Sequence, residues 1–279
     1  MTDEEYRYLT QALLKLTGTN LGNYKATQMR RRLDGYITSR RVSVAEFCHD
    51  LGNDPSALAM LRSFLTINVS EFFRDPDQFT LLKTRVLPDL LKQRSRLRIW
   101  SAGCSHGAEA YSVALMLEEL SPKGHHKIVA SDIDRDILNR AKQGGPYADS
   151  EMKNVSAAHL RKYFDKTEQG YLASGDLRAR VEFVRHDLLK DRPQASMDLI
   201  ICRNVVIYFN ENAKRQLNQR LVSAMKDDGV LFIGGTEALL DAQELGLKRM
   251  FPAFYRKQGG WKQQPGSSRQ ARAATLTKV

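Results

Sequence analysis

The stretch from Leu97 to Glu109 most constrains how this 279-residue chain can fold. Leu97 to Ala102 is an apolar run typical of a buried strand, and it ends at a loop that contains Gly103 and Gly107. A helical pattern of apolar residues begins directly after this loop, at Ala108. A strand, a glycine loop and a helix in this order are typical of α/β folds that bind nucleotide-like ligands. Glycine suits such a loop because, without a Cβ, its backbone can approach a ligand closely.

The glycine loop does not follow the dinucleotide pattern G-x-G-x-x-G, and a loop with two glycines is often only a tight turn. The next expected strand, at 127–131, adds to the evidence because Asp132 stands at its end. A carboxylate at this place can accept hydrogen bonds from both hydroxyls of a ribose. Asp132 could instead cap the helix expected at 135–142, but Asp134 can fill that role. We therefore favour ribose binding by Asp132.

Strands and helices alternate through the rest of the chain. We expect helices at 108–120 and 211–225, a β-hairpin with its turn at 173–176, and strands at 181–185, 197–202, 229–234 and 254–256. This order predicts a mostly parallel sheet covered by helices, with ligands bound beyond the carboxyl ends of its strands. The candidate residues fall at those ends: 103–109, Asp132, Asp187–Leu188 and Arg203–Asn204. Such a pocket suits an amino acid moiety, a ribose and a base, which S-adenosylmethionine fits better than NAD.

The first 80 residues carry helical patterns and no strand signal, which indicates a separate helical unit. A helix expected at 21–39 and the residues after it carry a basic cluster: Lys25, Arg30, Arg31, Arg32, Arg40 and Arg41. Between Gly22 and Val42, Asp34 is the one acidic residue. Such a cluster is either a solvated helix face or a surface that meets an acidic partner, and the residues alone leave both open.

The segment 66–74 alternates polar and apolar residues before it reaches two phenylalanines and an arginine. In this alternation Asn68 and Ser70 could face a ligand. Phe72 and Phe73 are more often core residues than a ligand platform. Arg74 beside them needs a partner, which is either a ligand or a nearby acid such as Asp75.

Composition indicates where the protein works. The net charge is +11, but residues 256–279 contain six Lys or Arg and no acid, so we expect a disordered tail at 258–279 rather than a nucleic-acid-binding arm. The three cysteines are far apart and fit no zinc spacing, which indicates a reducing cytosol and no metal site. We expect no membrane span and no signal peptide, and therefore a cytoplasmic protein.

The motifs together make the sequence similar to the CheR-type chemoreceptor glutamate O-methyltransferases. The matching segments are 68–74 (NVSEFFR), 100–105 (WSAGCS), 131–134 (SDID), 202–209 (CRNVVIYF) and 229–232 (GVLF), and they cover about residues 5–256 in the family's order. The segment 202–209 is the most specific of them.

The resemblance implies an α/β fold with a Rossmann-like class I S-adenosylmethionine-dependent methyltransferase domain. It implies an all-helical N-terminal domain at 1–80 that docks the receptor, and a methyltransferase domain at 81–257. A small inserted antiparallel β-subdomain would occupy about 164–185. No metal is implied, and the product from the cofactor would be S-adenosylhomocysteine.

The resemblance also implies roles for individual residues around the cofactor. Asn68, Ser70 and Arg74 would close over it from the linker side, Glu109 would hold the methionine amino group, and Asp132 the ribose. The adenine would be flanked by Asp187 and Leu188. The rest of the pocket would be lined by Gly103, Arg203, Asn204 and Val205. Arg74 and Tyr208 would lie nearest the transferred methyl group.

The glycine loop departs from the usual family pattern Ser-Thr-Gly-Glu-Glu-Pro-Tyr, since residues 105–111 read Ser-His-Gly-Ala-Glu-Ala-Tyr. The second glutamate is retained as Glu109, so its contact with the amino group is expected to remain. The hairpin near 170–180 looks shorter than in members that bind a receptor's C-terminal pentapeptide tether, and tether binding stays open.

The implied reaction transfers a methyl group to glutamate carboxylates of methyl-accepting chemotaxis receptors, whose acidic helices would dock on the basic cluster. We expect a monomer that reaches the membrane only through its receptor and does not bind nucleic acid.

One rival function is methylation of an amine or a nucleobase nitrogen. Enzymes of that kind usually have a motif like Asn/Asp-Pro-Pro-Tyr at the position of residues 203–206, which read Arg-Asn-Val-Val here. The other rival function is that of a non-catalytic S-adenosylmethionine sensor. The presence of both Arg74 and Tyr208 favours catalysis over this function.

Overall fold

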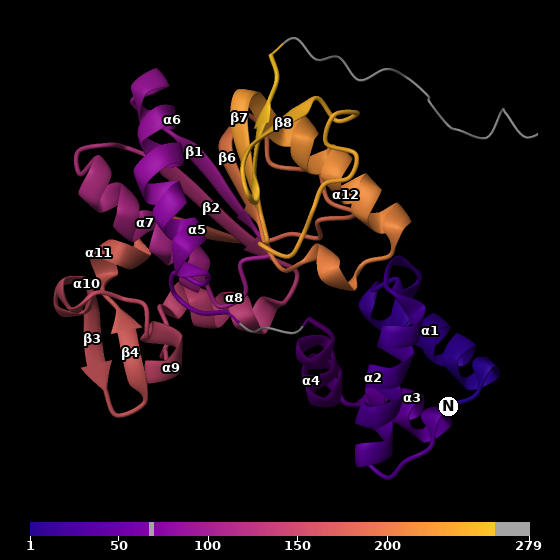
Figure 1. Cartoon of the computed structure of the whole chain (residues 1–279). Coiled ribbons are helices and arrows are strands. Elements are labelled where there is room, and N and C mark those ends of the chain that lie inside the picture. The colour runs from indigo at the N-terminus through magenta and orange to yellow at the C-terminus, as the bar shows by residue number, and fades with distance from the viewer. Residues whose placement is uncertain (67–69, 260–279) are drawn as a thin grey trace, which may run out of the picture.

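The computed structural model describes residues 1–66 and 70–259 (Figure 1). Buried apolar residues form two clusters, one between Leu9 and Leu65 and a larger one between Phe72 and Tyr255. The change from one cluster to the other therefore precedes the boundary that we expected at residue 80. The physical reason is that Phe72 and Phe79 pack into the core of the α/β part.

The smaller cluster lies among the N-terminal helices α1 (Asp3–Thr17), α2 (Ala26–Ser39), α3 (Val44–Asn53) and α4 (Pro55–Thr66). The single helix that we expected at 21–39 is divided. A short 3₁₀ turn, η1 (Leu21–Asn23), precedes α2, and Tyr24 and Lys25 between them have extended backbone. The division follows from Asn20, whose side chain accepts a hydrogen bond from the Gly22 amide and so favours a turn over a helix.

The α/β part is built on a mixed sheet with the strand order β5-β2-β1-β6-β7-β9-β8. Its strands are β1 (Arg98–Ala102), β2 (Lys127–Asp132), β5 (Val181–Arg185), β6 (Met197–Cys202), β7 (Met225–Ile233), β8 (Leu247–Phe251) and β9 (Phe254–Lys257). The first five strands in this order are parallel, whereas β9 and β8 add antiparallel strands at one edge. The predicted mostly parallel sheet is confirmed, although β8 was not expected.

Helices flank this sheet (Figure 1): α5 (Pro76–Leu81), α6 (Leu87–Gln93), α7 (Ala108–Leu120), α8 (Arg135–Gln143) and α12 (Glu211–Ala224). A π-helical turn, η2 (Leu82–Val86), joins α5 to α6. This turn lies just before Pro88, which has no amide hydrogen to continue a regular helical ladder.

A separate two-stranded antiparallel sheet consists of β3 (Phe164–Thr167) and β4 (Gly170–Ala173), close to the short helices α9 (Asp149–Met152), α10 (Ala157–Tyr163) and α11 (Gly175–Arg178). The prediction of a β-hairpin with its turn at 173–176 was wrong. Helix α11 stands where the second strand of that hairpin was expected to begin, because the Ser174 side chain caps this helix by accepting a hydrogen bond from the Leu177 amide. Strand β5 belongs to the main sheet, so the small sheet ends before the expected limit at residue 185.

A buried carboxylate joins three segments at the amino end of β6. Asp198 accepts a hydrogen bond from the Arg98 amide at 2.7 Å, and its oxygens lie 2.9 Å from Lys226 Nζ and 3.2 Å from Arg94 Nε. The Asp198 side chain is fully buried. Removing one member of such a buried ionic group leaves the others uncompensated.

We therefore predict that Asp198→Ala lowers the free energy of unfolding by about 3 kcal/mol in urea denaturation. The matched control is Asp165→Ala on β3, where the side chain is exposed and the change should stay within about 0.5 kcal/mol. A loss of less than about 1 kcal/mol for Asp198→Ala would contradict this view of the amino end of the sheet.

Candidate active site

One pocket lies beyond the carboxyl ends of β1, β2 and β6, as expected for a parallel sheet. Its lining contains the predicted site residues Ser70, Arg74, Gly103, Glu109, Asp132, Asp187, Leu188, Arg203, Asn204, Val205 and Tyr208. The remaining predicted residue, Asn68, lies outside the described residues. The fold thus brings together predicted site residues that are far apart in the sequence, the first of them Ser70 and the last Tyr208.

The glycine loop after β1 turns sharply against β2. The amides of Gly103 and Cys104 both donate to the Ser131 carbonyl, at 2.8 and 2.9 Å. Gly103 has a φ of +82°, and a Cβ at this position would lie 2.5 Å from the side chain of Val205. Glycine is therefore required both by the backbone conformation and by the close approach of the loop after β6.

Asp132 at the end of β2 is fixed by backbone amides. Its carboxylate accepts from the Ser105 amide at 2.9 Å and from the Asp134 amide at 3.1 Å. Asp134, and not Asp132, caps α8, since it accepts from the Asp136 amide. Burial raises the pKa of the Asp132 carboxyl, although the two amide donors act in the opposite direction. The carboxylate is thus oriented toward the pocket without serving as the helix cap.

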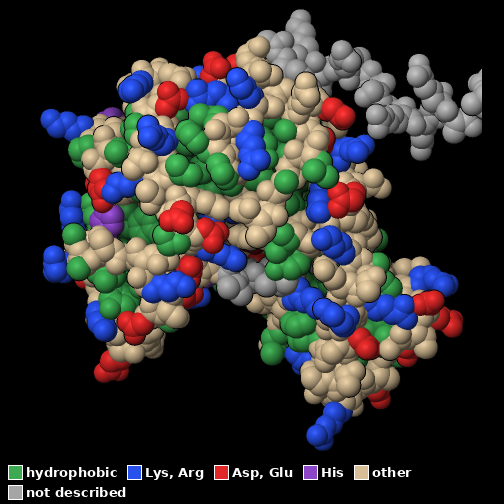
Figure 2. All heavy atoms as spheres, viewed as in Figure 1, with side chains coloured by type: hydrophobic (Ala, Val, Ile, Leu, Met, Phe, Trp, Pro, Cys, Tyr) green, Lys and Arg blue, Asp and Glu red, His purple; other side chains and the backbone are tan. Residues whose placement is uncertain are grey.

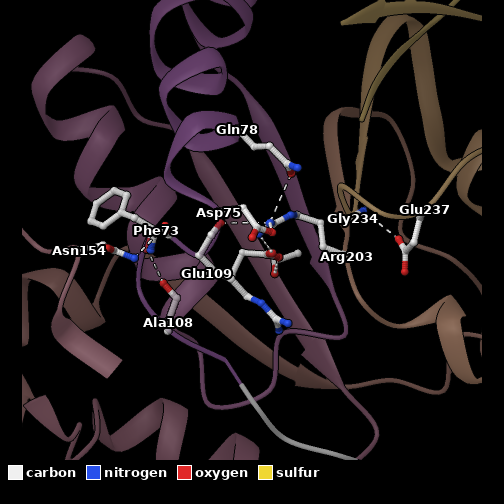
Figure 3. Close-up of polar contacts among 12 residues, drawn as sticks. Phe73, Asp75, Gln78, Ala108, Glu109, Asn154, Arg203, Gly234 and Glu237 are labelled. Carbon is white, nitrogen blue, oxygen red and sulfur yellow. Dashed lines mark hydrogen bonds and ion pairs between the residues drawn. The ribbon is translucent and has the colours of Figure 1, made fainter. Parts of the chain in front are cut away.

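Arg203, directly after β6, is a buried cation that contacts two carboxylates, of which Asp75 is half exposed (Figure 3). Its guanidinium lies over the rings of Phe79 and Phe232, with 5.3 and 4.7 Å to the ring centroids. Nη1 lies 3.4 Å from Glu109 on α7. Nη2 lies 2.5 Å from Asp75. The same side chain therefore joins the first turn of α7 to the segment that precedes α5.

The same guanidinium fixes the backbone of Arg74, because Arg203 Nη2 donates to the Arg74 carbonyl at 3.1 Å. Nη2 also lies 3.4 Å from Gln78 Oε1. Asp75, which the sequence offered as a partner for Arg74, forms its ion pair with Arg203 and has a φ of +60°. Arg74 lines the pocket and also a second, neighbouring hollow, which shares Asn204 with it.

Glu109 is largely buried in the first turn of α7, with 13% of its side chain exposed, and accepts a hydrogen bond from Ser101 Oγ at 2.7 Å. Burial raises the pKa of the Glu109 carboxyl, and the charge of Arg203 and the hydrogen bond from Ser101 oppose this shift only in part. A buried carboxylate at a pocket wall is well suited to bind an ammonium group, which would favour its charged form.

A further carboxylate supports the loop after β6. Glu237 accepts from the Gly234 amide at 2.8 Å (Figure 3) and also interacts with the backbone of Asn204, which has a φ of +60°. Burial raises the pKa of the Glu237 carboxyl. Sequence reasoning missed this residue, because a glutamate in an irregular loop carries no periodic signal.

The N-terminal helical region also reaches the pocket, which the sequence did not predict. Thr19, Asn20, Asn23 and Tyr24 belong to the lining. Burial, with the nearby charges of Asp187 and Asp132, raises the pKa of Tyr24 to about 12. Asn23 and Tyr24 fell within the helix that we expected at 21–39, so the sequence pattern placed them on a helix and not at the pocket.

This segment pairs with the residues after β6. The Lys25 amide donates to the Tyr208 carbonyl at 3.0 Å, and the Asn210 amide donates to the Asn23 carbonyl at 2.9 Å. The ring of Tyr24 meets that of Phe209 edge to face, with 5.2 Å between centroids. Tyr208 is therefore connected through its backbone to the residue that precedes α2.

The basic cluster is only partly exposed. Figure 2 shows Lys and Arg side chains (blue) on the surface of the N-terminal helical region, at the lower right. Arg30 pairs with Asp3 of α1 at 2.5 Å, so Asp34 is not the sole acid that opposes the cluster. Arg32 donates to the Phe64 carbonyl at 2.6 Å and lies over the ring of Phe64. Arg31, Arg40 and Arg41 are exposed, whereas Lys25 is half-buried.

Within 1–66 and 70–259, no group of three or more His, Cys, Asp or Glu side chains is arranged to hold a metal ion. Over the same ranges, no helix has the length and apolar character needed to cross a membrane.

Comparison with known proteins identifies the family. The model for "CheR methyltransferase, SAM binding domain" matches residues 68–251. The chain belongs to this family. Chemotaxis protein methyltransferases from Listeria innocua and Listeria monocytogenes are 37% and 38% identical to it over 257 residues, which cover 91% of this chain and 98% of each relative. Chemotaxis protein methyltransferase 1 of Pseudomonas aeruginosa is 34% identical over 239 residues, covering 81% of this chain and 87% of that protein.

This CheR-family protein is thus an S-adenosylmethionine-dependent methyltransferase that acts in chemotaxis. Its fold is that of class I methyltransferases, as the sequence predicted. The family model begins at residue 68, close to the change between the two hydrophobic clusters.

The position of Arg203 leads to a direct prediction. Arg203→Lys should lower the free energy of unfolding by about 2–4 kcal/mol, because one ammonium cannot contact Glu109, Asp75 and the Arg74 carbonyl together. The matched control is Arg256→Lys at the sheet edge, where the arginine pairs with Asp89 and a smaller loss is expected. Equal losses for the two variants in urea denaturation would contradict a special role for Arg203.

Proposed function

We propose that this protein transfers a methyl group from S-adenosylmethionine to glutamate side chains of chemoreceptors and forms glutamyl methyl esters for chemotactic adaptation. The observation that carries the proposal is that Arg74 and Tyr208, which are far apart within the matched region, line one pocket together with Glu109 and Asp132. The names of the relatives, which are chemotaxis protein methyltransferases, support the choice of a receptor as the substrate.

The residues of the pocket fit the cofactor by their chemistry. Glu109 is a buried carboxylate for the methionine ammonium, and Asp132 is an oriented carboxylate for the ribose hydroxyls. Asp187 and Leu188, beyond β5, would flank the adenine.

The methyl acceptor needs no general base, because a glutamate carboxylate with an ordinary pKa of about 4.3 is ionised at neutral pH. S-adenosylmethionine supplies an electrophilic methyl group on a sulfonium. A carbon–oxygen bond forms as the carbon–sulfur bond breaks, the electron pair stays on sulfur, and S-adenosylhomocysteine is released. No proton moves in this step, so the protein contributes alignment and removal of water from the acceptor.

Arg74 and Tyr208 have the groups that this alignment needs. The guanidinium of Arg74 can steer the acceptor carboxylate by charge, and the Tyr208 hydroxyl can donate a hydrogen bond to it. The Arg74 backbone is fixed by Arg203, and the Tyr208 backbone by Lys25. The backbone of both residues is therefore already fixed before the acceptor binds. This reduces the conformational entropy that the protein loses on binding.

The exposed part of the basic cluster is the proposed docking surface for the acidic cytoplasmic helices of a receptor. It consists of Arg31, Arg40 and Arg41, with Lys25 at its edge. Arg30 and Arg32 support the helical region from within, through Asp3 and the Phe64 carbonyl. We propose that the enzyme acts in the cytoplasm as a monomer and reaches the membrane through this contact.

The test is transfer of labelled methyl from S-adenosylmethionine to receptor-containing membranes, followed by mild base. We expect label on the receptor that base releases as methanol, because esters hydrolyse in base whereas methylamines do not. Tyr208→Phe should lower kcat about tenfold without abolishing transfer, since it removes one hydrogen bond and no proton acceptor. Label that resists base, or no transfer by a protein that binds S-adenosylhomocysteine, would contradict the proposal.

The raised pKa of Glu109 leads to a pH prediction for cofactor binding. Only the ionised carboxyl can bind the ammonium, and the bound ammonium in turn lowers this pKa, so binding releases a proton. Affinity for S-adenosylhomocysteine should therefore fall as pH is lowered through the pKa of Glu109. Calorimetry from pH 8 to pH 5 measures this, with Glu109→Gln as the comparison, which should bind weakly at every pH. A steep pH dependence retained in Glu109→Gln would assign the proton to another group.

A further inference from the structure

The backbone of residues 70–73, which leads to Arg74, is held by hydrogen bonds from outside the N-terminal helices. The Ser70 carbonyl lies 3.0 Å from His106 Nε2. The Phe72 amide donates to the Glu151 carbonyl at 2.9 Å, and the Phe73 amide donates to Ser112 Oγ at 2.9 Å. Each partner belongs to the α/β part, either at the start of α7 or near α9.

A second set of contacts holds the carbonyl side of the same run. Asn154 Nδ2 lies 3.5 Å from the Phe72 carbonyl and 3.4 Å from the Phe73 carbonyl (Figure 3). The ring of Phe72 is buried and packs edge to face on Tyr147, with 4.9 Å between centroids. Polar and apolar contacts together thus hold three residues of this run, Ser70, Phe72 and Phe73.

The Glu151 carboxylate connects these contacts. One oxygen lies 3.1 Å from His106 Nε2. The other lies 2.7 Å from Arg140 Nη2 and accepts from the Ala148 amide at 2.8 Å. A carboxylate with this many donors has a fixed orientation, so it also fixes the His106 ring beside Ser70.

The geometry determines the tautomer of His106. Nε2 faces two acceptors, the Ser70 carbonyl and Glu151, so Nε2 carries the hydrogen. Nδ1 is buried without a hydrogen-bond partner, and protonation there would leave a buried donor unpaired. Burial lowers the pKa of His106, against the opposing charge of Glu151, while the charge of Arg140 acts in the same direction as burial. Nε2 thus carries a hydrogen whether or not the ring is charged, and His106 is a donor to the Ser70 carbonyl.

We propose that His106, Ser112, Glu151 and Asn154 form a linker anchor, whose role is to position Ser70 and Arg74 at the cofactor. Glu151 and Asn154 come from the segment that precedes the small sheet, so this segment would serve cofactor binding. The inference rests on the proposed function, since it assumes that Ser70 and Arg74 contact the cofactor.

The expected consequence follows from preorganisation. If the run 70–73 is not held, only a fraction of molecules has Ser70 and Arg74 in the binding arrangement, and the apparent Kd rises by the inverse of that fraction. Bound cofactor then restores the arrangement, so kcat at saturating cofactor changes much less than Kd. A merely structural residue would instead lower the stability of the whole fold.

The test compares Glu151→Ala and Asn154→Ala with the control Glu182→Ala, which removes an exposed carboxylate paired with Lys127 on the main sheet. Calorimetry should give a Kd for S-adenosylhomocysteine raised about tenfold in the first two and unchanged in the control. Hydrogen exchange should quicken at the amides of Phe72 and Phe73, and not in β1 or β6.

His106 provides a rescue experiment. His106→Ala removes the donor to the Ser70 carbonyl and should raise Kd about tenfold, whereas His106→Gln keeps an N–H donor and should recover most of the affinity. Unchanged Kd and unchanged exchange at Phe72 and Phe73 in Glu151→Ala and Asn154→Ala would overturn the proposal. A wild-type protein that does not bind S-adenosylhomocysteine would instead overturn the proposed cofactor site, and the exchange data would still test the anchor.

Discussion

The buried guanidinium of Arg203 is the interaction on which the site depends. It lies over the rings of Phe79 and Phe232, and it contacts an acid on α7, an acid before α5 and the backbone of Arg74. An arginine is suited to this place because its planar fork makes several hydrogen bonds in fixed directions and stays charged when buried. Without it, the charge of Glu109 would lack its main compensation, and the Arg74 backbone would lose one of its anchors.

The pocket is shared between two hydrophobic units that fold from different parts of the chain. The contact between residues 23–25 and 208–210 brings Tyr24 into the pocket and joins the start of α2 to Tyr208. In the proposed function α2 carries the receptor-docking arginines. Docking and methyl transfer would then meet at two adjacent residues, Tyr24 and Lys25, which gives a short physical route between substrate recognition and the reacting groups.

Much of the α/β part was predictable because its signals are local. Apolar runs gave the strands from β1 to β7 of the main sheet, and helix α7 was expected at its observed bounds. The pocket residues at the strand ends followed from topology. Two predictions failed for other reasons. The small sheet was misplaced because Ser174 caps a helix, and β8 was missed because Leu247 is its one buried residue, so the strand has no buried apolar run. Tyr24, Glu237 and the anchor at Glu151 depend on contacts between distant irregular segments, which no periodicity records.

The proposed function requires that a single pocket orients S-adenosylmethionine by Glu109 and Asp132, with its methyl group toward Arg74 and Tyr208. A crystal structure of the complex with S-adenosylhomocysteine tests it most directly. We predict the amino group within hydrogen-bond distance of Glu109, the ribose hydroxyls at Asp132, and the sulfur on the side of Arg74 and Tyr208. A ligand in the reverse orientation, or bound outside this pocket, would contradict the account.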